Sequence, residues 1–277
     1  MVSEDIKSTR NRLRICLVGS GAIARRVVEL LGPSSTSSIE LVAIAVPPGV
    51  KRQSWWPEET VQISDPNALA TLDADIVLEV ASREAVSQWG FHALKAARKF
   101  VICSASALTD DHLRSSLENA ARSFGSQLIL AHGALGGLHA LSAASTLALH
   151  EVVHSIRKHP DAWKGTPAEA IADLSSLKEA LTIYEGGARD AASSFPANAN
   201  AVVISSLAGL GLDRTRVQLV ADPSARRNIH SIRAIGVFGN LDLTIENEPM
   251  QTNPKTSEMT ALSLVRLLES EMSSLVV

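Results

Sequence analysis

Residues 226–240 (RRNIHSIRAIGVFGN) alternate between apolar and polar positions, and this period predicts a β-strand. His230 falls on the same face of that strand as Ile232 and Ala234, which is the face expected to be covered. Histidine has a pKa close to neutral pH, so it is well suited to act as a general acid or base. A covered histidine can also be a core group that is satisfied by hydrogen bonds. His230 is therefore a candidate for proton transfer, with a purely structural role as the alternative.

A glycine-rich loop, LVGSGAIA, lies between an apolar run and an amphipathic run near the N-terminus. Gly19, Gly21 and Ala24 have the G-x-G-x-x-G/A spacing, in which the first glycine permits a tight turn and the second lets a pyrophosphate approach the backbone. Ala22 and Ile23 begin the expected helix, whose free N–H groups attract anions. The loop predicts a dinucleotide-binding site formed by Gly19, Gly21, Ala22 and Ile23. The alternative is a glycine turn in a related domain that has lost its ligand.

The end of the second expected strand bears on the choice of cofactor. The dinucleotide fingerprint has an acidic residue there, which binds the ribose 2′-hydroxyl, whereas this chain has Val46, Pro47 and Pro48. Lys51 and Arg52 follow shortly afterwards, and they either receive a 2′-phosphate or are solvated loop residues. Because no carboxylate repels a 2′-phosphate, the sequence is compatible with either NAD or NADP.

Strand and helix patterns alternate in the first half of the chain. Strand-like apolar runs are expected at 12–19, 39–46, 74–82, 100–105 and 126–133, with helices at 22–31, 84–99 and 110–124. This alternation is typical of an α/β fold with βαβ units and a parallel sheet covered on both faces. We expect residues 1–133 to form a Rossmann-type dinucleotide-binding domain.

The pattern changes after residue 133. Helices are expected at 136–149, 166–181 and 198–212, and alternating strand-like runs at 150–159, 214–223, 229–239 and 241–249. We expect residues 134–253 to form a second, α+β domain with a mostly antiparallel sheet, which binds the substrate and forms a dimer interface. The amphipathic helix within residues 254–277 is expected to pack back on the first domain.

Composition and charge restrict the class of protein. The 277-residue chain is 45% hydrophobic, which is enough for a large core, and its net charge of −3 argues against nucleic acid or an anionic membrane as a partner. No apolar run is long enough to cross a bilayer. Cys16 and Cys103 lie in apolar runs without metal-ligand spacing, so we expect no metal site and a reducing, cytoplasmic compartment.

Four polar stretches in the second half are long and distinctive: AWKGTPAE, FPANANA, SLAGLGLDRT and NPKTS. Together with the GSGAIA loop, they closely resemble the L-aspartate dehydrogenase family over nearly the whole chain. The resemblance implies an NAD(P)-dependent oxidoreductase that converts L-aspartate to oxaloacetate and ammonia through iminoaspartate, which can also feed NAD biosynthesis. It also implies that His230 is the catalytic histidine and that Ala134 and Asn200 contact the cofactor.

The chain departs from the family pattern at three places. His139 in GALGGLHALSA stands where the family often has aspartate, His159 is an insertion in RKHP, and EVAS at residues 79–82 replaces ECAG. All three lie near the expected meeting point of cofactor and substrate. They therefore bear on substrate preference and turnover rather than on the class of reaction.

An aspartate substrate carries two carboxylates, which must meet cations, hydroxyls or free backbone N–H groups. The candidates in the polar stretches are Lys158, Lys164, Thr166, Lys255 and Thr256. Each of them is also compatible with a surface or capping role.

Other histidines are less informative. His132 and His139 flank the GALGG turn, where they could approach a nicotinamide. The rest lack ligand spacing and are expected to be structural residues on helix or strand surfaces, namely His92, His112, His150 and His154.

Two other functions remain open at this point. Homoserine dehydrogenase and dihydrodipicolinate reductase share the two-domain architecture, and a panel of substrates separates them from an aspartate dehydrogenase. A non-catalytic sensor would bind NAD(P)H without turnover. In every case the partner is a small molecule, and a homodimer is expected because two-fold assemblies are the commonest oligomers.

Overall fold

The computed structural model describes residues 12–35, 38–196 and 199–276. In the first half of the chain, a six-stranded parallel sheet has the order β3-β2-β1-β4-β5-β6. Its strands are β1 (Leu13–Val18), β2 (Ile39–Ala45), β3 (Val61–Ile63), β4 (Ile76–Glu79), β5 (Lys99–Ile102) and β6 (Gln127–Leu130). This order is that of the Rossmann fold, in which the direction of strand addition reverses between β1 and β4. The prediction of a Rossmann-type domain is confirmed.

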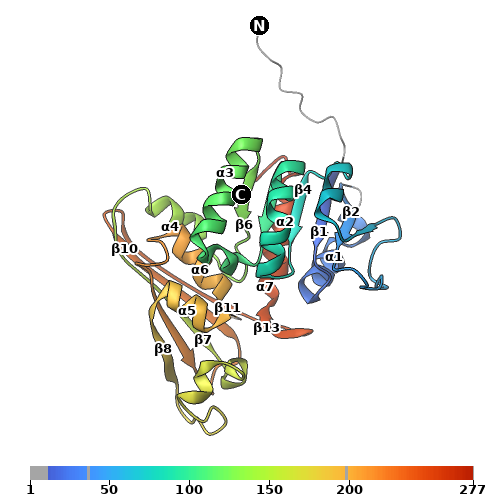
Figure 1. Cartoon of the computed structure of the whole chain (residues 1–277). Coiled ribbons are helices and arrows are strands. Elements are labelled where there is room, and N and C mark those ends of the chain that lie inside the picture. Colours follow the sequence, from blue (N-terminus) through green and yellow to red (C-terminus); the bar gives the residue numbers. More distant parts are fainter. Residues whose placement is uncertain (1–11, 36–37, 197–198, 277) are drawn as a thin grey trace.

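Helices cover both faces of this sheet (Figure 1). One face carries α2 (Arg83–Ala96), α3 (Asp111–Phe124) and the short helices η1 (Pro66–Thr71) and η2 (Ala105–Thr109), and the other carries α1 (Ala22–Ser35). The strand residues alternate accordingly, since Cys16 lies in the core under α2 and Ile15 in the core under α1. Five of these strands are mainly apolar because both sheet faces are covered, and the sequence predicts these five. It misses β3, a three-residue edge strand in which two residues are exposed.

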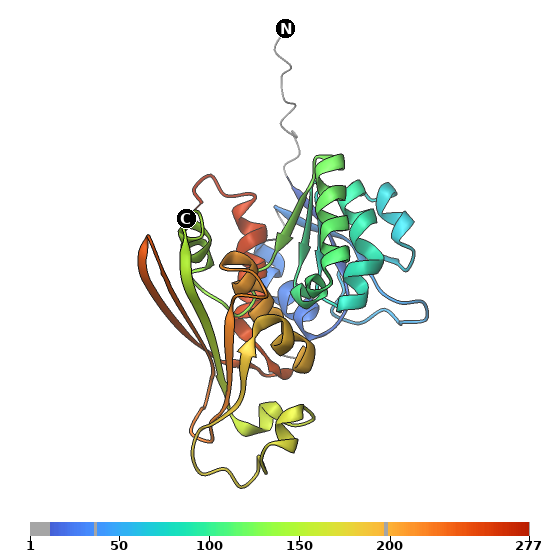
Figure 2. The same ribbon diagram turned by 60° about the vertical axis from the view of Figure 1, so that its left-hand side comes forward.

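The second half is built on a five-stranded sheet with the order β11-β10-β7-β9-β8. Its strands are β7 (Leu149–Lys158), β8 (Leu181–Gly187), β9 (Arg216–Ala221), β10 (Asn228–Gly236) and β11 (Gly239–Asn247). The helices α4 (Leu138–Ala144), α5 (Ala188–Ser194) and α6 (Ala199–Ala208) lie on one side of it (Figure 2). The short strands β12 (Pro249–Met250) and β13 (Asn253–Ser257) form a separate pair.

We expected this second sheet to be mostly antiparallel, and it is mixed instead. β7 and β9 are parallel, while the pairs β10–β11, β10–β7 and β8–β9 are antiparallel. Alternating polarity shows that a strand has one covered face, but it does not show the direction of the neighbouring strand. The parallel pair arises because β8, α5 and α6 lie between β7 and β9 in the chain and form a long crossover connection.

The expected helix at 166–181 is also wrong. After η3 (Pro160–Trp163), only η4 (Pro167–Ala170) is helical, and turns then lead to β8. The side chain of Asp173 accepts hydrogen bonds from the backbone N–H and the hydroxyl of Ser175. Such local bonds offer the backbone an alternative to helix, and they explain why a helix-rich composition gives turns here.

The last helix, α7 (Glu258–Ser270), returns to the first half of the chain and packs on α1 (Figure 2). Leu264 and Leu268 are fully buried in one core with Val27 and Leu31 of α1. α7 and α1 therefore lie on the same face of the first sheet and cover it together. The division of the chain at residues 133 and 253 stays a prediction.

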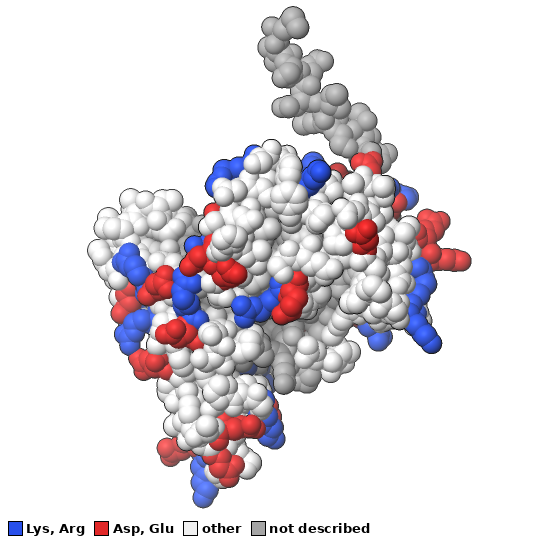
Figure 3. Space-filling view, in the orientation of Figure 1, with Lys and Arg blue, Asp and Glu red and all other residues white. Residues whose placement is uncertain are grey.

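Polar contacts join the two halves. Arg189 of α5 donates a hydrogen bond to the carbonyl of Thr109 (2.8 Å) and forms ion pairs with Asp111 of α3 and with Asp213. Figure 3 shows Lys and Arg side chains interleaved with Asp and Glu over one face of the molecule. Within the residues that the structure describes, no helix is both long and apolar enough to span a membrane.

Candidate active site

The glycine loop follows β1 at the carboxyl edge of the parallel sheet, where the strand order reverses. The N–H of Gly19 donates to the carbonyl of Ala45 (2.8 Å), which holds the loop against β2. Gly19 has φ of 114°, and a Cβ atom there would lie 2.8 Å from the Cβ of Ala81. Only glycine satisfies both the backbone angle and this close approach. The glycine loop therefore packs closely against Ala81 in the loop after β4.

Gly21 has a different environment. A Cβ atom added there would meet nothing within 4 Å, so the residue opens onto free space at the start of α1. Free N–H groups at the start of a helix favour an anion. An open glycine at the amino end of α1, at the reversal point of the sheet, fits the pyrophosphate of a dinucleotide.

The loop after β2 does not supply the two free cations that a 2′-phosphate would need. Arg52 donates hydrogen bonds to the carbonyls of Pro57, Glu58 and Thr60, so its guanidinium holds that loop together. Lys51 is exposed. The sequence allowed Lys51 and Arg52 to be either phosphate-binding or ordinary loop residues. Arg52 is a loop residue that stabilises its own loop.

A buried carboxylate organises the loops after β4 and β5. Glu79 Oε1 accepts hydrogen bonds from the backbone N–H of Ala81 (2.7 Å) and the hydroxyl of Ser104 (2.8 Å), and Oε2 from the N–H groups of Cys103 (3.2 Å) and Ser104 (2.9 Å). Burial raises the pKa of Glu79, and these hydrogen bonds oppose that shift. In the EVAS stretch, Glu79 thus ties the two loops together, and Ser82 caps α2.

A small cavity of about 90 Å³ opens beside the start of α1, between the two halves of the chain. It gathers residues from α1, from the loops after β5 and β6, from β7, α6 and β10, and from the C-terminal β13 and α7. The lining residues are Ile23, Cys103, Gly133, Ala134, Lys158, Asn200, Ala201, Ile204, His230, Thr256, Ser257 and Thr260. The sequence-based candidates Ile23, Ala134, Asn200, Lys158, Thr256 and His230 are all in this set.

His230 reaches the cavity from β10, on the covered face that the sequence predicts. It is 4% exposed, and its Nδ1 lies 3.2 Å from Nε2 of His154. The ring of His154 is completely buried and its Nδ1 lies 2.8 Å from the hydroxyl of Ser205. Burial lowers the pKa of His230 well below its usual value, and the nearby His154 and Lys158 lower it further. His230 is therefore neutral in the free protein at neutral pH.

Our expectation that His154 is a surface residue is wrong. Burial lowers its pKa to about 3. The sequence contains a signal for this position, because His154 alternates with Val152 and Ile156 in the run HEVVHSIRKH and so shares their covered face.

Lys158, the last residue of β7, places a cation in the same cavity. It is 5% exposed, and its Nζ lies 6.0 Å from the ring centroid of the buried Trp163. Burial lowers the pKa of Lys158 to about 8. At neutral pH the cavity thus contains one cationic amine and one neutral imidazole, an arrangement that suits an anionic substrate and a proton transfer.

Two of the remaining substrate candidates, Lys164 and Thr166, do not line this cavity. Lys164 is exposed and forms an ion pair with Asp161, which raises its pKa. Thr166 caps η4, since its hydroxyl accepts from the N–H of Ala168 and donates to the carbonyl of Trp163. The backbone of Lys255 lies in β13, but its side chain lies outside the described part of the structure.

Three asparagines hold the walls of the cavity. Asn200 Oδ1 accepts from the N–H of Ser106 in η2 (2.9 Å), Asn247 Nδ2 donates to the carbonyl of Ala134 (2.9 Å), and Asn228 Nδ2 donates to the hydroxyl of Ser257 (3.3 Å). The sequence points to Asn200 through the FPANANA stretch. Asn228 and Asn247 are missed, because a strand pattern does not distinguish a bridging amide from a solvated one.

The other polar groups near the cavity have limited roles. Burial and the charge of Glu79 raise the pKa of the Cys103 thiol to about 12, so it is a poor nucleophile at neutral pH. The rings of His132 and His139 stack edge to face, with centroids 4.9 Å apart, and neither residue lines the cavity. In the part of the chain that the structure describes, no three His, Cys, Asp or Glu side chains are grouped for a metal.

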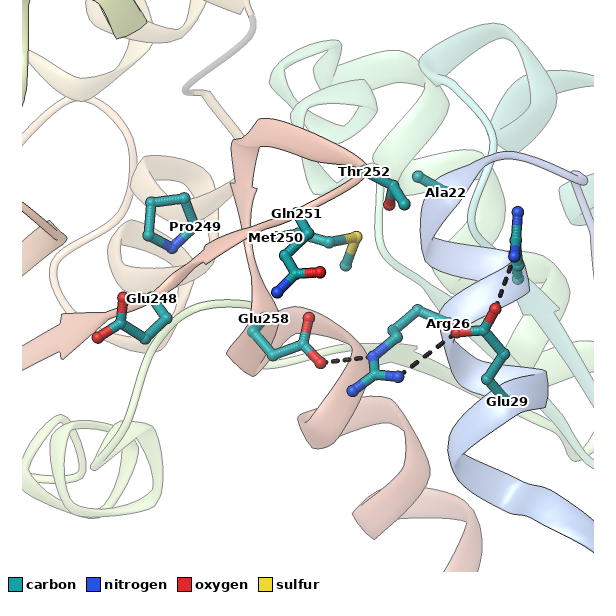
Figure 4. Close-up of a pocket in the computed structure, with 10 residues that line it drawn as sticks. Ala22, Arg26, Glu29, Glu248, Pro249, Met250, Gln251, Thr252 and Glu258 are labelled. Carbon is teal, nitrogen blue, oxygen red and sulfur yellow. Dashed lines mark hydrogen bonds and ion pairs between the residues drawn. The ribbon is translucent and has the colours of Figure 1, made fainter.

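A larger cavity of about 340 Å³ lies between α1 and the segment 248–252, beside the start of α7 (Figure 4). Its charges are paired, because Arg26 binds Glu29 and Glu258 and Arg25 binds Glu29. Ala22 of the glycine loop lines it as well. The smaller cavity is nevertheless the candidate reaction site, since it contains His230 and Lys158.

The parallel sheet, the glycine loop at its reversal point and the buried histidine–lysine cavity define a two-domain dehydrogenase that binds a nicotinamide dinucleotide. Residues 19–131 match the family described as homoserine dehydrogenase, NAD binding domain, and residues 139–271 match aspartate dehydrogenase, C-terminal.

Individual relatives agree with this match. The chain is 47% identical to the L-aspartate dehydrogenase of Brucella anthropi, over 95% of this chain and 98% of that protein, and 42% identical to that of a Polaromonas species, over 96% and 100%. The crystal structure of aspartate dehydrogenase from Thermotoga maritima superimposes with a TM-score of 0.74 at 25% identity, over 96% of this chain and 99% of that chain. The chain belongs to the L-aspartate dehydrogenase family of oxidoreductases, which confirms the resemblance, and its cofactor is NAD or NADP.

The two loop glycines lead to different predictions. Gly19→Ala is expected to destabilise the protein by about 1–3 kcal/mol, because the added methyl meets Ala81 in a strained conformation. Gly21→Ala is expected to keep its stability and to raise the Kd for NADH by about tenfold or more, because its methyl enters the space assigned to the pyrophosphate. Thermal unfolding and fluorescence titration with NADH measure the two effects. Unchanged NADH affinity in Gly21→Ala would show that the cofactor lies elsewhere.

Proposed function

We propose that the protein catalyses the NAD(P)-dependent oxidation of L-aspartate to oxaloacetate and ammonia through iminoaspartate. The observation that carries the proposal is the placement of neutral His230 and cationic Lys158 in one buried cavity beside the start of α1. L-aspartate dehydrogenases that cover nearly all of the chain support the choice of substrate. Either cofactor serves, since no acidic residue ends β2 and Arg52 is engaged in its own loop.

The glycine loop and the cavity residues divide the work of binding. Gly19, Gly21, Ala22 and Ile23 hold the cofactor at the start of α1, where Ile23 lines the cavity together with the cofactor-contacting residues Ala134 and Asn200. A bound nicotinamide supplies the hydride acceptor for the amino-acid Cα. Lys158 binds one carboxylate of the substrate, and the hydroxyl of Thr256 is placed to assist. The buried position of Lys158 strengthens this contact, because a charge pair interacts more strongly where water is excluded.

His230 is the acid and base of the proposed reaction. Its depressed pKa keeps the ring unprotonated in the free enzyme, so it can accept a proton. The two substrate carboxylates bring negative charge to the cavity and raise the pKa of the ring toward neutrality. The ring then takes a proton from the water that adds to the imine and returns it to the departing amine, a contribution of about 10²–10⁴-fold.

The biological setting follows from the chemistry. Iminoaspartate is a reactive imine, and its release would supply NAD biosynthesis as an alternative to its hydrolysis. The buried, unpaired thiols of Cys16 and Cys103 support a reducing, cytoplasmic setting.

The acid–base role predicts that His230→Asn lowers kcat for aspartate oxidation by on the order of 10²-fold or more. Asparagine keeps a polar group of similar size in the cavity but does not titrate near pH 7. NADH affinity and the unfolding temperature are expected to change little, because the cofactor loop lies in the other half of the chain. Absorbance at 340 nm measures turnover for both aspartate oxidation and the reduction of oxaloacetate with ammonia.

A substrate panel distinguishes this proposal from its alternatives. Turnover of homoserine or dihydrodipicolinate in preference to aspartate would assign another dehydrogenase or reductase activity. NADH binding without turnover of any of these compounds would indicate a sensor. A fully active His230→Asn enzyme would contradict the role of His230 while leaving the substrate in place.

The depressed pKa of Lys158 predicts a pH-dependent affinity for dicarboxylates. The lysine is cationic below about pH 8 and loses its charge above it. The inhibition constant of succinate, a non-reactive dicarboxylate, is therefore expected to be nearly constant below about pH 7, to double by about pH 8 and then to approach a rise of about tenfold per pH unit. Inhibition kinetics against aspartate at saturating NAD measure it.

Two variants control this measurement. Lys158→Met is expected to bind succinate weakly at every pH, because its side chain carries no charge. Lys164→Met removes an exposed lysine that is paired with Asp161 and should behave as wild type. A pH profile in Lys158→Met that matches the wild type would assign the titration to another group.

We further propose that the protein is a homodimer that pairs through the outer face of the five-stranded sheet. Among the described elements, no helix packs on the side of this sheet opposite α4, α5 and α6 (Figure 2). This face carries partly exposed apolar residues, Val153, Ile229 and Ile235, next to Ser231 and Thr244, whose hydroxyls bond to each other. Such a mixed, flat surface suits a two-fold contact.

Light scattering at micromolar concentration is expected to give the mass of two chains. The double variant Val153→Lys, Ile229→Lys is expected to be monomeric, because the added charges repel across the two-fold axis. Phe91→Lys changes another exposed apolar residue and should leave the dimer intact. A wild-type monomer would contradict the proposal.

A further inference from the structure

His154 lies diagonally across the sheet from His230. In the β7–β10 register, His230 is opposite Ile156 and His154 is opposite Ile232, so the two histidines are two positions apart on the same covered face. Diagonal neighbours of this kind come within reach of large side chains. The rings meet through His154 Nε2 and His230 Nδ1 at 3.2 Å, with centroids 5.4 Å apart. The pair is buried and has a fixed geometry.

The hydrogen bonds around Ser205 determine where the protons lie. The Ser205 hydroxyl is 3.0 Å from the carbonyl of Val202, which can only accept a hydrogen bond. The hydroxyl proton therefore points to Val202, and Ser205 Oγ accepts from Nδ1–H of His154. Both rings are neutral, so each carries one N–H. Nε2 of His154 then has no proton and accepts from Nδ1–H of His230.

This chain of donors leaves one nitrogen of His230 with a free lone pair. With Nδ1 protonated, Nε2 is the basic atom of the ring, and the ring lines the cavity. In the opposite tautomer, Nδ1 of His154 carries no proton and accepts from the Ser205 hydroxyl, so that hydroxyl no longer donates to the carbonyl of Val202. Only the arrangement in which both histidines carry their proton on Nδ1 satisfies the Ser205–Val202, His154–Ser205 and His230–His154 hydrogen bonds together.

We propose that His154, held by Ser205, is a positioning residue that keeps His230 in the Nδ1–H tautomer with Nε2 free to act as the base in the cavity. The role of the tautomer in turnover rests on the proposed function. His154 touches neither substrate nor cofactor in this arrangement, and it acts only through the ring of His230. It replaces the carboxylate that often orients a catalytic histidine, and it does so without adding negative charge.

The neutrality of His154 has a chemical consequence. A carboxylate beside His230 would raise the pKa of the ring and compete for the cation of Lys158. A neutral imidazole orients the ring without placing a negative charge beside Lys158.

Nitrogen-15 NMR of the protein labelled at its eight histidines tests the tautomer without reference to turnover. Long-range correlations distinguish a protonated ring nitrogen from an unprotonated one, and the signals of His230 are assigned by their loss in His230→Asn. We expect Nδ1 of His230 to be protonated and Nε2 to be unprotonated at neutral pH. A protonated Nε2 in the wild type would overturn the inference, whether or not the enzyme oxidises aspartate.

Variants of His154 test the consequence for the reaction. His154→Leu removes the acceptor, and a buried Nδ1–H without a partner is costly, so we expect His230 to shift to the Nε2–H tautomer. We expect kcat to fall on the order of 10²-fold while KM for aspartate and Kd for NADH change less than about threefold. His154→Gln restores an acceptor oxygen and is expected to recover most of kcat.

Three controls separate positioning from stability. Ile156→Val perturbs the same covered face without removing an acceptor, and it is expected to lower stability slightly with kcat unchanged. Ser205→Ala removes the hydroxyl that accepts from Nδ1–H of His154, so neither tautomer of His154 is favoured. We expect a mixture of tautomers and an intermediate kcat. If His154→Leu folds poorly, the pair Ser205→Ala and His154→Gln still decides the outcome.

Failure of the positioning role of His154 and failure of the proposed function give different results. Full turnover in Ser205→Ala with a mixed tautomer would overturn the positioning role while leaving the proposed activity intact. Full turnover in His230→Asn would contradict the proposed function of His230, and the NMR result would still decide the tautomer.

Discussion

The buried carboxylate of Glu79 is the constraint on which the geometry of the site depends. At the end of β4 it accepts four hydrogen bonds, which join the backbone after β4 to the backbone after β5. Ala81, which is held in this way, is also the surface against which Gly19 packs. The glycine loop therefore takes its position from Glu79 through one intervening residue. An apolar side chain at this position would leave buried donors without partners, a cost that well-packed loops do not easily absorb.

Hydrogen bonds of asparagine side chains, as well as ion pairs, join the two halves of the chain. Asn200 joins α6 to η2, and Asn247 joins β11 to the turn after β6. These two hydrogen bonds are 2.9 Å long, partly buried and formed by uncharged side chains, whereas the ion pairs of Arg189 are partly exposed and screened by salt. The contacts that hold Asn200 and Ala134 at the cavity therefore depend little on ionic strength and pH.

Sequence alone predicts those features that depend on local order. Five of the six parallel strands, the glycine loop and the covered position of His230 follow from short-range patterns, and the structure has them, whereas the short edge strand β3 carries no such pattern. The parallel pairing of β7 with β9 and the contact between His154 and His230, which are 76 residues apart, depend on how distant segments meet. Arg52 shows the same limit, because a free cation and one that holds a loop have the same sequence signature.

The packing of α7 on α1 makes the order of synthesis matter. The ribosome releases α1 early, but the residues that complete its core, Leu264 and Leu268, emerge only near the end of translation. Until then the face of the first sheet that carries α1 is incompletely covered, and Val27 and Leu31 are exposed to solvent on the nascent chain. The dinucleotide-binding half therefore completes its core only after α7 has been made. Until then the growing chain exposes apolar surface that chaperones can bind.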